Sequence, residues 1–369
     1  MRLLDQMARL GRPGRNLAAR LDLLGFAGVG YYLHRLRDQR RYSRFYKGAR
    51  DAVYDQIWRE AATAVGAQAT QLGPGQFELS RGGAKTRVDG RAVALDDPDT
   101  LRRAMDKTLA HRLLADAKVT VSEHVEFHFG DQAPARAFLE QADGPCVVKP
   151  AAGTGGGHGV TAGIARPEEL RRACTYAARD TDRLLIERQA PGPVYRLLLL
   201  DGELLDVVRT TPERLTGDGR STISKLMRTE NHRRAAAFGT AGLAVLGVDL
   251  DLALTLEQGG LSFSSVLGAG QSVPIRSITN GSGPERCETY TAPLADSIKE
   301  EARAGAETLG LRLAGVDVIT PDPTRPLREV GGVLNEVNGR PGLHYHYVVA
   351  DPEQATRVAI PVLERLLSE

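Results

Sequence analysis

The stretch that decides the fold lies near the end of the chain and reads Leu334-Asn335-Glu336-Val337-Asn338-Gly339-Arg340-Pro341-Gly342. We interpret its first part as a β-strand, in which alternate side chains share a face, so that Glu336 and Asn338 point the same way. The glycines and the proline that follow are typical of a turn that ends a strand. Carboxylate and amide oxygens are ligands that Mg²⁺ prefers, and the stretch therefore predicts part of a metal site.

A second predicted strand, at residues 313–320, carries a single carboxylate, Asp317, among apolar side chains. A lone carboxylate in a buried strand is costly unless it is paired or bound to a metal. If the two strands are neighbours, Asp317, Glu336 and Asn338 can hold two metal ions. The alternative is that Asp317 and Glu336 are surface charges on half-exposed strands. We favour the metal site because of the lysine and glycine features described below.

Length and composition are those of a globular protein. The chain has 369 residues, 42% hydrophobic and 25% charged, which favours two or three domains. We expect an N-terminal domain at residues 1–98, a central subdomain at 99–190 and a C-terminal subdomain at 191–369. Three scattered cysteines indicate a reducing compartment. The apolar run at residues 23–33 is too short to span a membrane and lacks a signal-peptide cleavage site, so we expect a cytoplasmic protein.

Positive charge is concentrated at the N-terminus. Residues 1–50 hold twelve Arg and Lys residues against three Asp residues, a net charge of +9, whereas the whole chain has a net charge of +2. A basic arm of this kind can contact nucleic acid, an anionic membrane or an acidic partner. We prefer helices at residues 1–45 that pack leucines such as Leu17 and Leu24 against the body and leave the arginines in solvent.

Hydrophobic periodicity and turn residues predict the other elements. Helices are expected at residues 52–65, 101–117, 133–141, 167–179, 292–309 and 352–367, with one more from residue 221. Strands are expected at residues 68–72, 76–80, 85–88, 145–150, 159–164, 183–187, 195–200 and 203–209. Residues 240–290 are interpreted as strands and loops.

A glycine-rich stretch, residues 151–159, follows the short strand that ends near Lys149. Glycine lets backbone N–H groups approach and surround a phosphate, and the lysine can reach phosphate oxygens. The predicted strand–loop–strand context differs from the strand–loop–helix context of a Rossmann turn. A flexible hairpin is the alternative, and Lys149 is the reason that we favour phosphate binding.

The order of these features resembles the ATP-grasp superfamily of carboxylate–amine ligases, over roughly residues 100–350. The resemblance rests on Asp106-Lys107, Val147-Val148-Lys149-Pro150 with the glycine-rich stretch, residues 185–192, Gly217-Asp218-Gly219-Arg220, Asp317 and Glu336-Val337-Asn338. Within the superfamily, the cyanophycin-synthetase-like branch shares Tyr195-Arg196, the 217–220 turn and Val273-Pro274-Ile275-Arg276 with Asn280. The set is specific, although no single motif is.

The resemblance implies an α+β ATP-grasp fold, in which two α/β subdomains clasp ATP and a smaller helical and α/β domain precedes them. The residues implied to bind ATP are Lys107, Lys149, Gly155, Gly156, Gly157, His158, Glu187, Arg188, Gln189, Ala190 and Arg209. Asp317, Glu336 and Asn338 are implied to hold two Mg²⁺ ions, with Mn²⁺ as an alternative metal. Lys149, Arg276, Asn280 and Arg340 are implied in catalysis, and Arg196, Arg276, Arg340 and His344 in binding the acyl substrate.

The implied reaction joins the carboxylate of an amino acid or peptide to an amine through an acyl phosphate and gives ADP and phosphate. A non-catalytic ATP-binding protein and a protein associated with nucleic acid or membranes are alternatives, and a homo-oligomer is left open. One departure concerns Val194, which stands where the family often has an acidic residue that holds the ribose hydroxyls. Ribose binding is therefore weaker here or is supplied by another residue.

Overall fold

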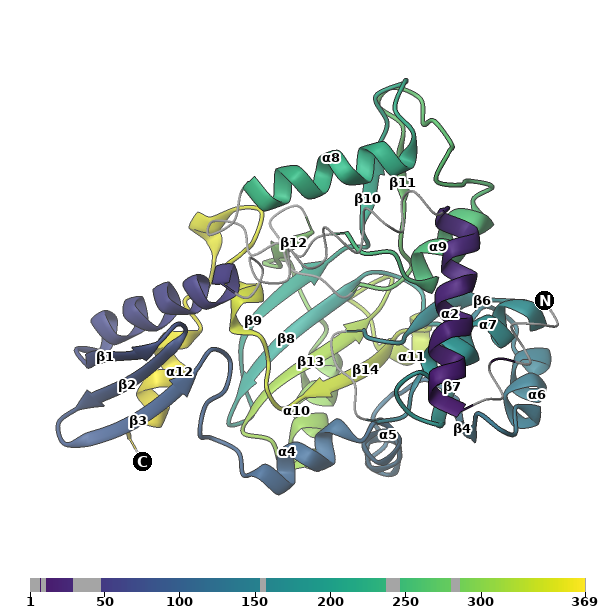
Figure 1. The fold of residues 1–369 in the computed structure, drawn as a ribbon. Coiled ribbons are helices and arrows are strands. Elements are labelled where there is room, and N and C mark those ends of the chain that lie inside the picture. Colours follow the sequence, from purple (N-terminus) through teal and green to yellow (C-terminus); the bar gives the residue numbers. More distant parts are fainter. Residues whose placement is uncertain are drawn as a thin grey trace.

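A central five-stranded antiparallel sheet positions the rest of the chain, in the order β12-β9-β8-β13-β14 (Figure 1). The computed structural model describes residues 7, 11–28, 48–152, 157–236, 246–279 and 286–368. The strands of the central sheet are β8 (Val194–Leu200), β9 (Glu203–Thr210), β12 (Cys287–Thr289), β13 (Leu313–Ile319) and β14 (Val333–Asn338). The strands predicted around Asp317 and Glu336 are therefore neighbours.

Helices cover one face of this sheet. They are α10 (Asp296–Leu309), α4 (Pro98–Met105) and α5 (Lys107–Asp116), with the short α11 (Leu327–Val330) before β14. Tyr195, Leu197 and Val316 point into the core beneath them. Because side chains alternate along a strand, Arg196 and Asp317, the next residues along β8 and β13, are directed to the opposite face.

A small N-terminal unit packs on part of that opposite face, at the left of Figure 1. It consists of a helix at residues 48–65 and the antiparallel sheet β1 (Gln68–Gly73), β2 (Gln76–Arg81) and β3 (Ala84–Asp89), close to the predicted elements. Tyr54 and Trp58 share a buried core with Leu198 of β8, with Leu343 and with α12 (Ala359–Leu366). This core crosses the predicted boundary at residue 98. The segment before α12 contains η1 (Leu343–His346) and η2 (Pro352–Gln354).

A second antiparallel sheet, in the order β4-β7-β5-β6, lies at the other side of the central sheet (Figure 1). Its elements are β4 (His124–His128), α6 (Ala133–Gln141), β5 (Cys146–Pro150), β6 (Thr161–Ile164), α7 (Pro167–Ala177) and β7 (Arg183–Arg188). Its core also includes side chains from later elements, namely β10 (Arg214–Thr216), α8 (Ile223–Ala236), α9 (Leu250–Gln258) and the neighbourhood of β11 (Ser272–Pro274). Packing therefore crosses the predicted boundary at residue 190 as well.

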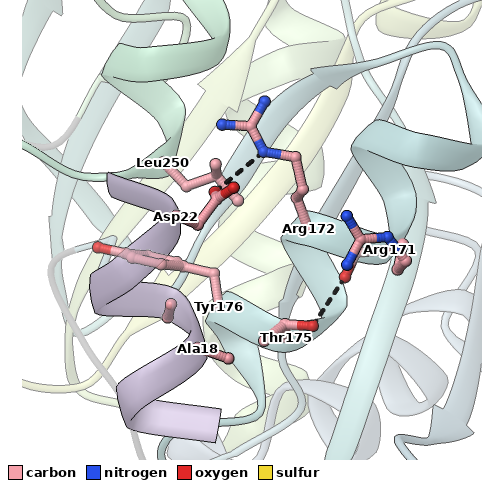
Figure 2. Close-up of a pocket in the computed structure, with 8 residues that line it drawn as sticks. Ala18, Asp22, Arg171, Arg172, Thr175, Tyr176 and Leu250 are labelled. Carbon is pink, nitrogen blue, oxygen red and sulfur yellow. Dashed lines mark hydrogen bonds and ion pairs between the residues drawn. The ribbon is translucent and has the colours of Figure 1, made fainter. Parts of the chain in front are cut away.

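The described part of the basic N-terminus, helix α2 (Gly11–Ala27), packs against α7. Figure 2 shows the crevice between them, where Arg172 Nε lies 3.0 Å from Asp22 Oδ2. The crevice encloses about 10 Å³, close to the least that one water needs, so it is a packing contact. Leu17, expected to be buried, is 47% exposed, and Leu23 is buried instead. The arm at residues 1–50 otherwise lies largely outside the described residues.

Two further expectations differ from the structure. The helix predicted at residues 101–117 breaks at Asp106, which has an extended backbone. The Asp106 side chain caps the second part, α5, by accepting a hydrogen bond from Leu109 N at 3.1 Å. Helix α9 was not predicted, because its first five residues are all buried and give no polar face to set a helical period. In the part of the chain that the structure describes, no helix combines the length and apolar character needed to cross a bilayer.

Candidate active site

A cleft of about 490 Å³ lies between the two large sheets. The central sheet contributes Arg196, Asp317, Glu336 and Asn338 to its lining, and the second sheet contributes Lys149 and Glu187. The remaining lining includes Lys107, the segment at residues 188–192 and the segment after β11 at residues 274–279. Residues separated by more than two hundred positions in the sequence thus face one space.

The predicted metal ligands share the cleft face of β13 and β14. Asp317 and Glu336 are direct partners in the strand register, and Asn338 pairs with Gly315. The Asn338 amide group donates hydrogen bonds to Asp317 Oδ2 and to the Gly315 carbonyl, each at 3.3 Å. The side-chain oxygen of Asn338 therefore remains an acceptor beside the two carboxylates.

Each of these carboxylates has a cationic partner. Arg196 Nη2 donates to Asp317 Oδ2 at 2.6 Å, and the Lys107 ammonium donates to Glu336. Burial raises the pKa of Asp317 above its ordinary value, against the lowering effect of Arg196. Burial acts in the same direction on Glu336, but Lys107, with Lys149 and Arg196, outweighs it and holds the pKa of Glu336 below its usual value. Each of these two carboxylates is therefore compensated by one cation.

The donor set fits a divalent metal such as Mg²⁺, which prefers carboxylate and amide oxygens. The described residues contain no group of three or more His, Cys, Asp or Glu side chains that could hold a metal ion. A metal at Asp317 and Glu336 would therefore depend on Asn338 and on oxygens supplied by a ligand.

The second sheet contributes a buried ion pair to the cleft. Lys149 Nζ lies 2.7 Å from Glu187 Oε1. The other carboxylate oxygen, Glu187 Oε2, is buried and has no hydrogen-bond partner among the described residues. His111 Nε2 lies 4.0 Å away, and burial, with Lys149 nearby, lowers the pKa of His111 to about 2, so the imidazole is neutral. Glu187 therefore leaves an acceptor for a ligand that carries an N–H group.

The segment after β7 also lines the cleft, and it contains Arg188, Gln189, Ala190 and Val194. Gln189 Oε1 accepts a hydrogen bond from Gly163 N at 2.7 Å, which ties the segment to β6. Arg188 Nε donates to Glu123 Oε2 at 2.6 Å, so its charge is already compensated. Val194 lines the cleft with an apolar side chain, at the position where ATP-binding relatives were expected to carry an acidic residue.

Arg276 lines the cleft and is held from behind. Its guanidinium donates to Asp249 and, at 2.7 Å, to the Gly247 carbonyl. Asp251, which is fully buried, accepts backbone hydrogen bonds from Ala162 at 3.2 Å, Ser277 at 3.0 Å and Ile278 at 3.2 Å. One carboxylate therefore joins α9, β6 and the segment at residues 274–279, three parts of the cleft wall.

The buried Asp251 predicts a pH dependence of stability. Burial raises its pKa from 3.8 to about 6, and Asp249 adds to the effect. Because the folded state holds this proton more tightly than the unfolded state, the contribution of Asp251 to the free energy of unfolding should fall as pH rises from about 4 to about 6. Relative to Asp251→Asn, the free energy of unfolding of the wild type should fall by roughly 2–3 kcal/mol over that range. Urea unfolding at several pH values measures it, and parallel profiles would contradict it.

Several predicted site residues are not brought to the cleft. His158 is 66% exposed on its side chain, 3.9 Å from Asp180. Arg209 is in register with Tyr195, on the helix-covered face, and pairs with Glu288. His344 Nδ1 lies 3.1 Å from Tyr54 Oη, and burial lowers its pKa to about 3, so it is not a cation. Gly157 lines the cleft, whereas Gly155, Gly156 and Asn280 lie outside the described residues.

Other lining residues were missed by sequence reasoning. Strict alternation places Asn335 away from Glu336, but the register shifts between Asp317 and Val318, which leaves Asn335 as an extra residue, and it lines the cleft. Arg91 and Tyr345 also line it. No local pattern marks Arg91, because only the packing of the N-terminal unit brings it there.

Comparisons with known proteins agree with this geometry. The chain is 32% identical over 270 residues to a cyanophycin synthetase of Geminocystis herdmanii, a match that spans 72% of this chain and 30% of that protein. It is 30% identical over 278 residues to the glutathione biosynthesis bifunctional protein GshAB of Enterococcus faecalis, across 72% of this chain and 35% of that protein. A solved bifunctional glutathione synthetase from Pasteurella multocida matches 82% of this chain and 42% of its own with a TM-score of 0.51 at 22% identity.

This chain is an ATP-grasp protein. The resemblance to the cyanophycin-synthetase-like branch and the α+β ATP-grasp fold predicted from the sequence are thereby confirmed. The ATP-grasp chain spans about a third of the length of the curated relatives that it matches. No protein-family model matches it.

Proposed function

We propose that the chain is an ADP-forming ligase that joins the carboxylate of an amino acid or peptide to an amine, with ATP and a divalent metal. The observation that carries the proposal is one cleft that contains three ion pairs from different parts of the chain. These pairs are Lys149 with Glu187, Lys107 with Glu336, and Arg196 with Asp317. Such paired charges can exchange partners when a polyanion and a metal enter together.

The Glu187 side of the cleft is suited to the nucleotide. The unpartnered Glu187 Oε2 can accept a hydrogen bond from the amino group of adenine. Gln189 and Ala190, which follow Glu187 closely in the chain, also line the cleft. Lys107 and Lys149 would act as point charges on phosphate oxygens, and the glycine-rich stretch would surround those oxygens with backbone N–H groups.

Asp317, Glu336 and Asn338 would hold Mg²⁺, or Mn²⁺, and we propose two ions. When bound, the metal would neutralise and orient the phosphate groups. Lys107 and Arg196, which pair with Glu336 and Asp317 in this structure, would add to this neutralisation by contacting the phosphate oxygens.

In the proposed reaction, a carboxylate oxygen of the acid attacks the γ-phosphorus of ATP, and the bond to ADP breaks. The amine nitrogen then attacks the carbonyl carbon of the acyl phosphate, and phosphate leaves. Lys149, Arg276 and Arg340 would stabilise developing negative charge at fixed positions, and Asn280 is proposed to assist. The rate acceleration would come from orientation of the reactants and from charge neutralisation rather than from a covalent enzyme intermediate.

The remaining predictions stand as parts of this proposal. Amino acids or peptides are favoured because the matched relatives are named for cyanophycin and glutathione biosynthesis. The divisions at residues 98 and 190, a homo-oligomeric assembly and a cytoplasmic location are retained as expectations. The comparisons give no support to a non-catalytic or nucleic-acid-binding role.

An ADP-release assay with hydroxylamine as the amine tests the proposal, because hydroxylamine traps an acyl phosphate as a stable hydroxamate whatever the natural amine is. We expect ADP release that depends on one member of a panel of amino acids and dipeptides, with the matching hydroxamate in the mass spectrum, and we expect EDTA to stop it. ATP binding without acid-dependent release from any panel member would contradict the proposal and favour a non-catalytic ATP-binding protein.

A further inference from the structure

The N-terminal unit sends one side chain, Arg91, into the cleft. Arg91 follows Gly90 in a tight turn in which Asp89 and Ala92 exchange backbone hydrogen bonds at 3.0 and 2.8 Å. Gly90 has a φ of +55°, a conformation that favours glycine. The buried Trp58 donates its indole N–H to the Gly90 carbonyl at 2.9 Å. The position of Arg91 is therefore fixed by a packed core rather than by a free loop.

The charges that line the cleft do not balance. Among the lining side chains that the structure describes, seven are cationic and three are anionic. Five of the cations are held by carboxylates: Lys107, Lys149, Arg188, Arg196 and Arg276 pair with Glu336, Glu187, Glu123, Asp317 and Asp249, respectively. The other two are Arg91 and Arg340, which are exposed and have no ion-pair or hydrogen-bond partner among the described residues.

These two arginines line the same cleft. Arg340 is the second residue after β14, and Gly342 and Tyr345, just beyond it, line the cleft as well. Burial lowers the pKa of His344 most, and the charges of Arg50, Arg196 and Arg91 act in the same direction. The chain therefore concentrates uncompensated positive charge at the end of the cleft formed by the N-terminal unit and η1.

We propose that Arg91 and Arg340 bind a second carboxylate of the acid substrate, so that the acid is a dicarboxylate, such as an acidic amino acid or a peptide that has a side-chain carboxylate besides its free C-terminus. This inference rests on the proposed function and names its substrate class. Guanidinium groups bind a carboxylate through two parallel hydrogen bonds. The nucleotide phosphates already have Lys107, Lys149 and the Asp317 site, whereas Arg91 belongs to a unit outside both nucleotide-facing sheets.

The test compares acids that differ only in the second carboxylate. L-Glutamate is set against L-glutamine and L-aspartate against L-asparagine, each with MgATP and hydroxylamine, and the KM of acid and of ATP are measured separately. Wild type should prefer the dicarboxylate of a pair. Arg91→Gln should raise its KM about tenfold or more, the size of a charged hydrogen bond, and leave the KM for ATP and the use of the amide member unchanged. Arg340→Gln should raise the same KM by a similar factor, but it should also slow turnover of both members, because Arg340 is proposed to act in catalysis as well.

A matched control is Arg87→Gln, which removes an exposed arginine from the same unit, where Arg87 pairs with Glu78. It should behave as wild type. A raised KM for ATP in Arg91→Gln, with the acid KM unaltered, would assign Arg91 to a phosphate and overturn the proposal. Equal use of both members of every pair by wild type would also overturn it.

If no acid in the panel releases ADP, the proposed function loses its support, and the subsite is judged by binding alone. Calorimetry then compares glutarate with its monoamide, glutaramate, on protein loaded with MgADP. Tighter binding of glutarate that is lost in Arg91→Gln supports the subsite. Equal binding of the two, or no binding of either, rejects it.

Discussion

Glu336→Gln should abolish acid-dependent ADP release while the protein remains folded. Glu336 lies between Lys107 and Asp317. As a proposed metal ligand, it would supply negative charge that is needed while the γ-phosphoryl group moves. Loss of that charge should reduce turnover on the order of a hundredfold or more. The Lys107 and Glu336 side chains are 12% and 33% exposed. Because glutamine still offers an acceptor to Lys107, the free energy of unfolding should fall by about 1–2 kcal/mol, less than for loss of a fully buried ion-pair partner.

The matched control is Glu329→Gln on α11, an exposed position where the same change removes a carboxylate that pairs with Arg325. It should keep wild-type turnover. A well-folded Glu336→Gln protein that releases ADP at nearly the wild-type rate would remove Glu336 from the proposed metal site.

Asp317→Asn should lose both activity and stability. Asp317 and Arg196 are both largely buried, with side chains 11% and 15% exposed. Removal of one partner leaves a buried charge without compensation, which costs about 3–5 kcal/mol. Urea unfolding should therefore report a marked loss for Asp317→Asn, in contrast to Glu336→Gln, although both changes replace a carboxylate with an amide on the same face of the sheet.

The double variant Arg196→Gln/Asp317→Asn separates stability from catalysis. Removal of both charges should recover much of the lost free energy of unfolding, because no buried ion is left unpaired. Turnover should stay absent, because the proposed metal ligand is still missing. A single Asp317→Asn variant as stable as wild type would mean that water reaches and compensates Arg196.

Strands were predictable where one chemical constraint was strong. A lone carboxylate in an apolar strand, and a carboxylate and an amide two residues apart, were enough to single out Asp317, Glu336 and Asn338, and the register shows that their strands are neighbours. Hydrophobic periodicity and turn residues also sufficed for the strands expected at residues 76–80 and 85–88, which pair as β2 and β3. In each case the deciding information lies within a few residues.

The cap at Asp106 was missed although aspartate is a favoured N-cap residue, because it interrupts an otherwise continuous apolar period. Features that depend on packing were not predictable from local patterns. The register shift that brings Asn335 to the cleft has no marker in the sequence. Arg209 was assigned to the site by resemblance, yet strand alternation places it on the face that the helices cover.

The shared core of the N-terminal unit has a consequence for how the protein unfolds and how it can be shortened. Leu198, Leu343 and Val362 are covered by Tyr54 and Trp58, not by side chains of their own segments alone. A protein shortened to begin after residue 98 would present these leucines and this valine to water as a contiguous apolar surface, which invites self-association. The unit and the central sheet should therefore melt in a single cooperative transition rather than as separable modules.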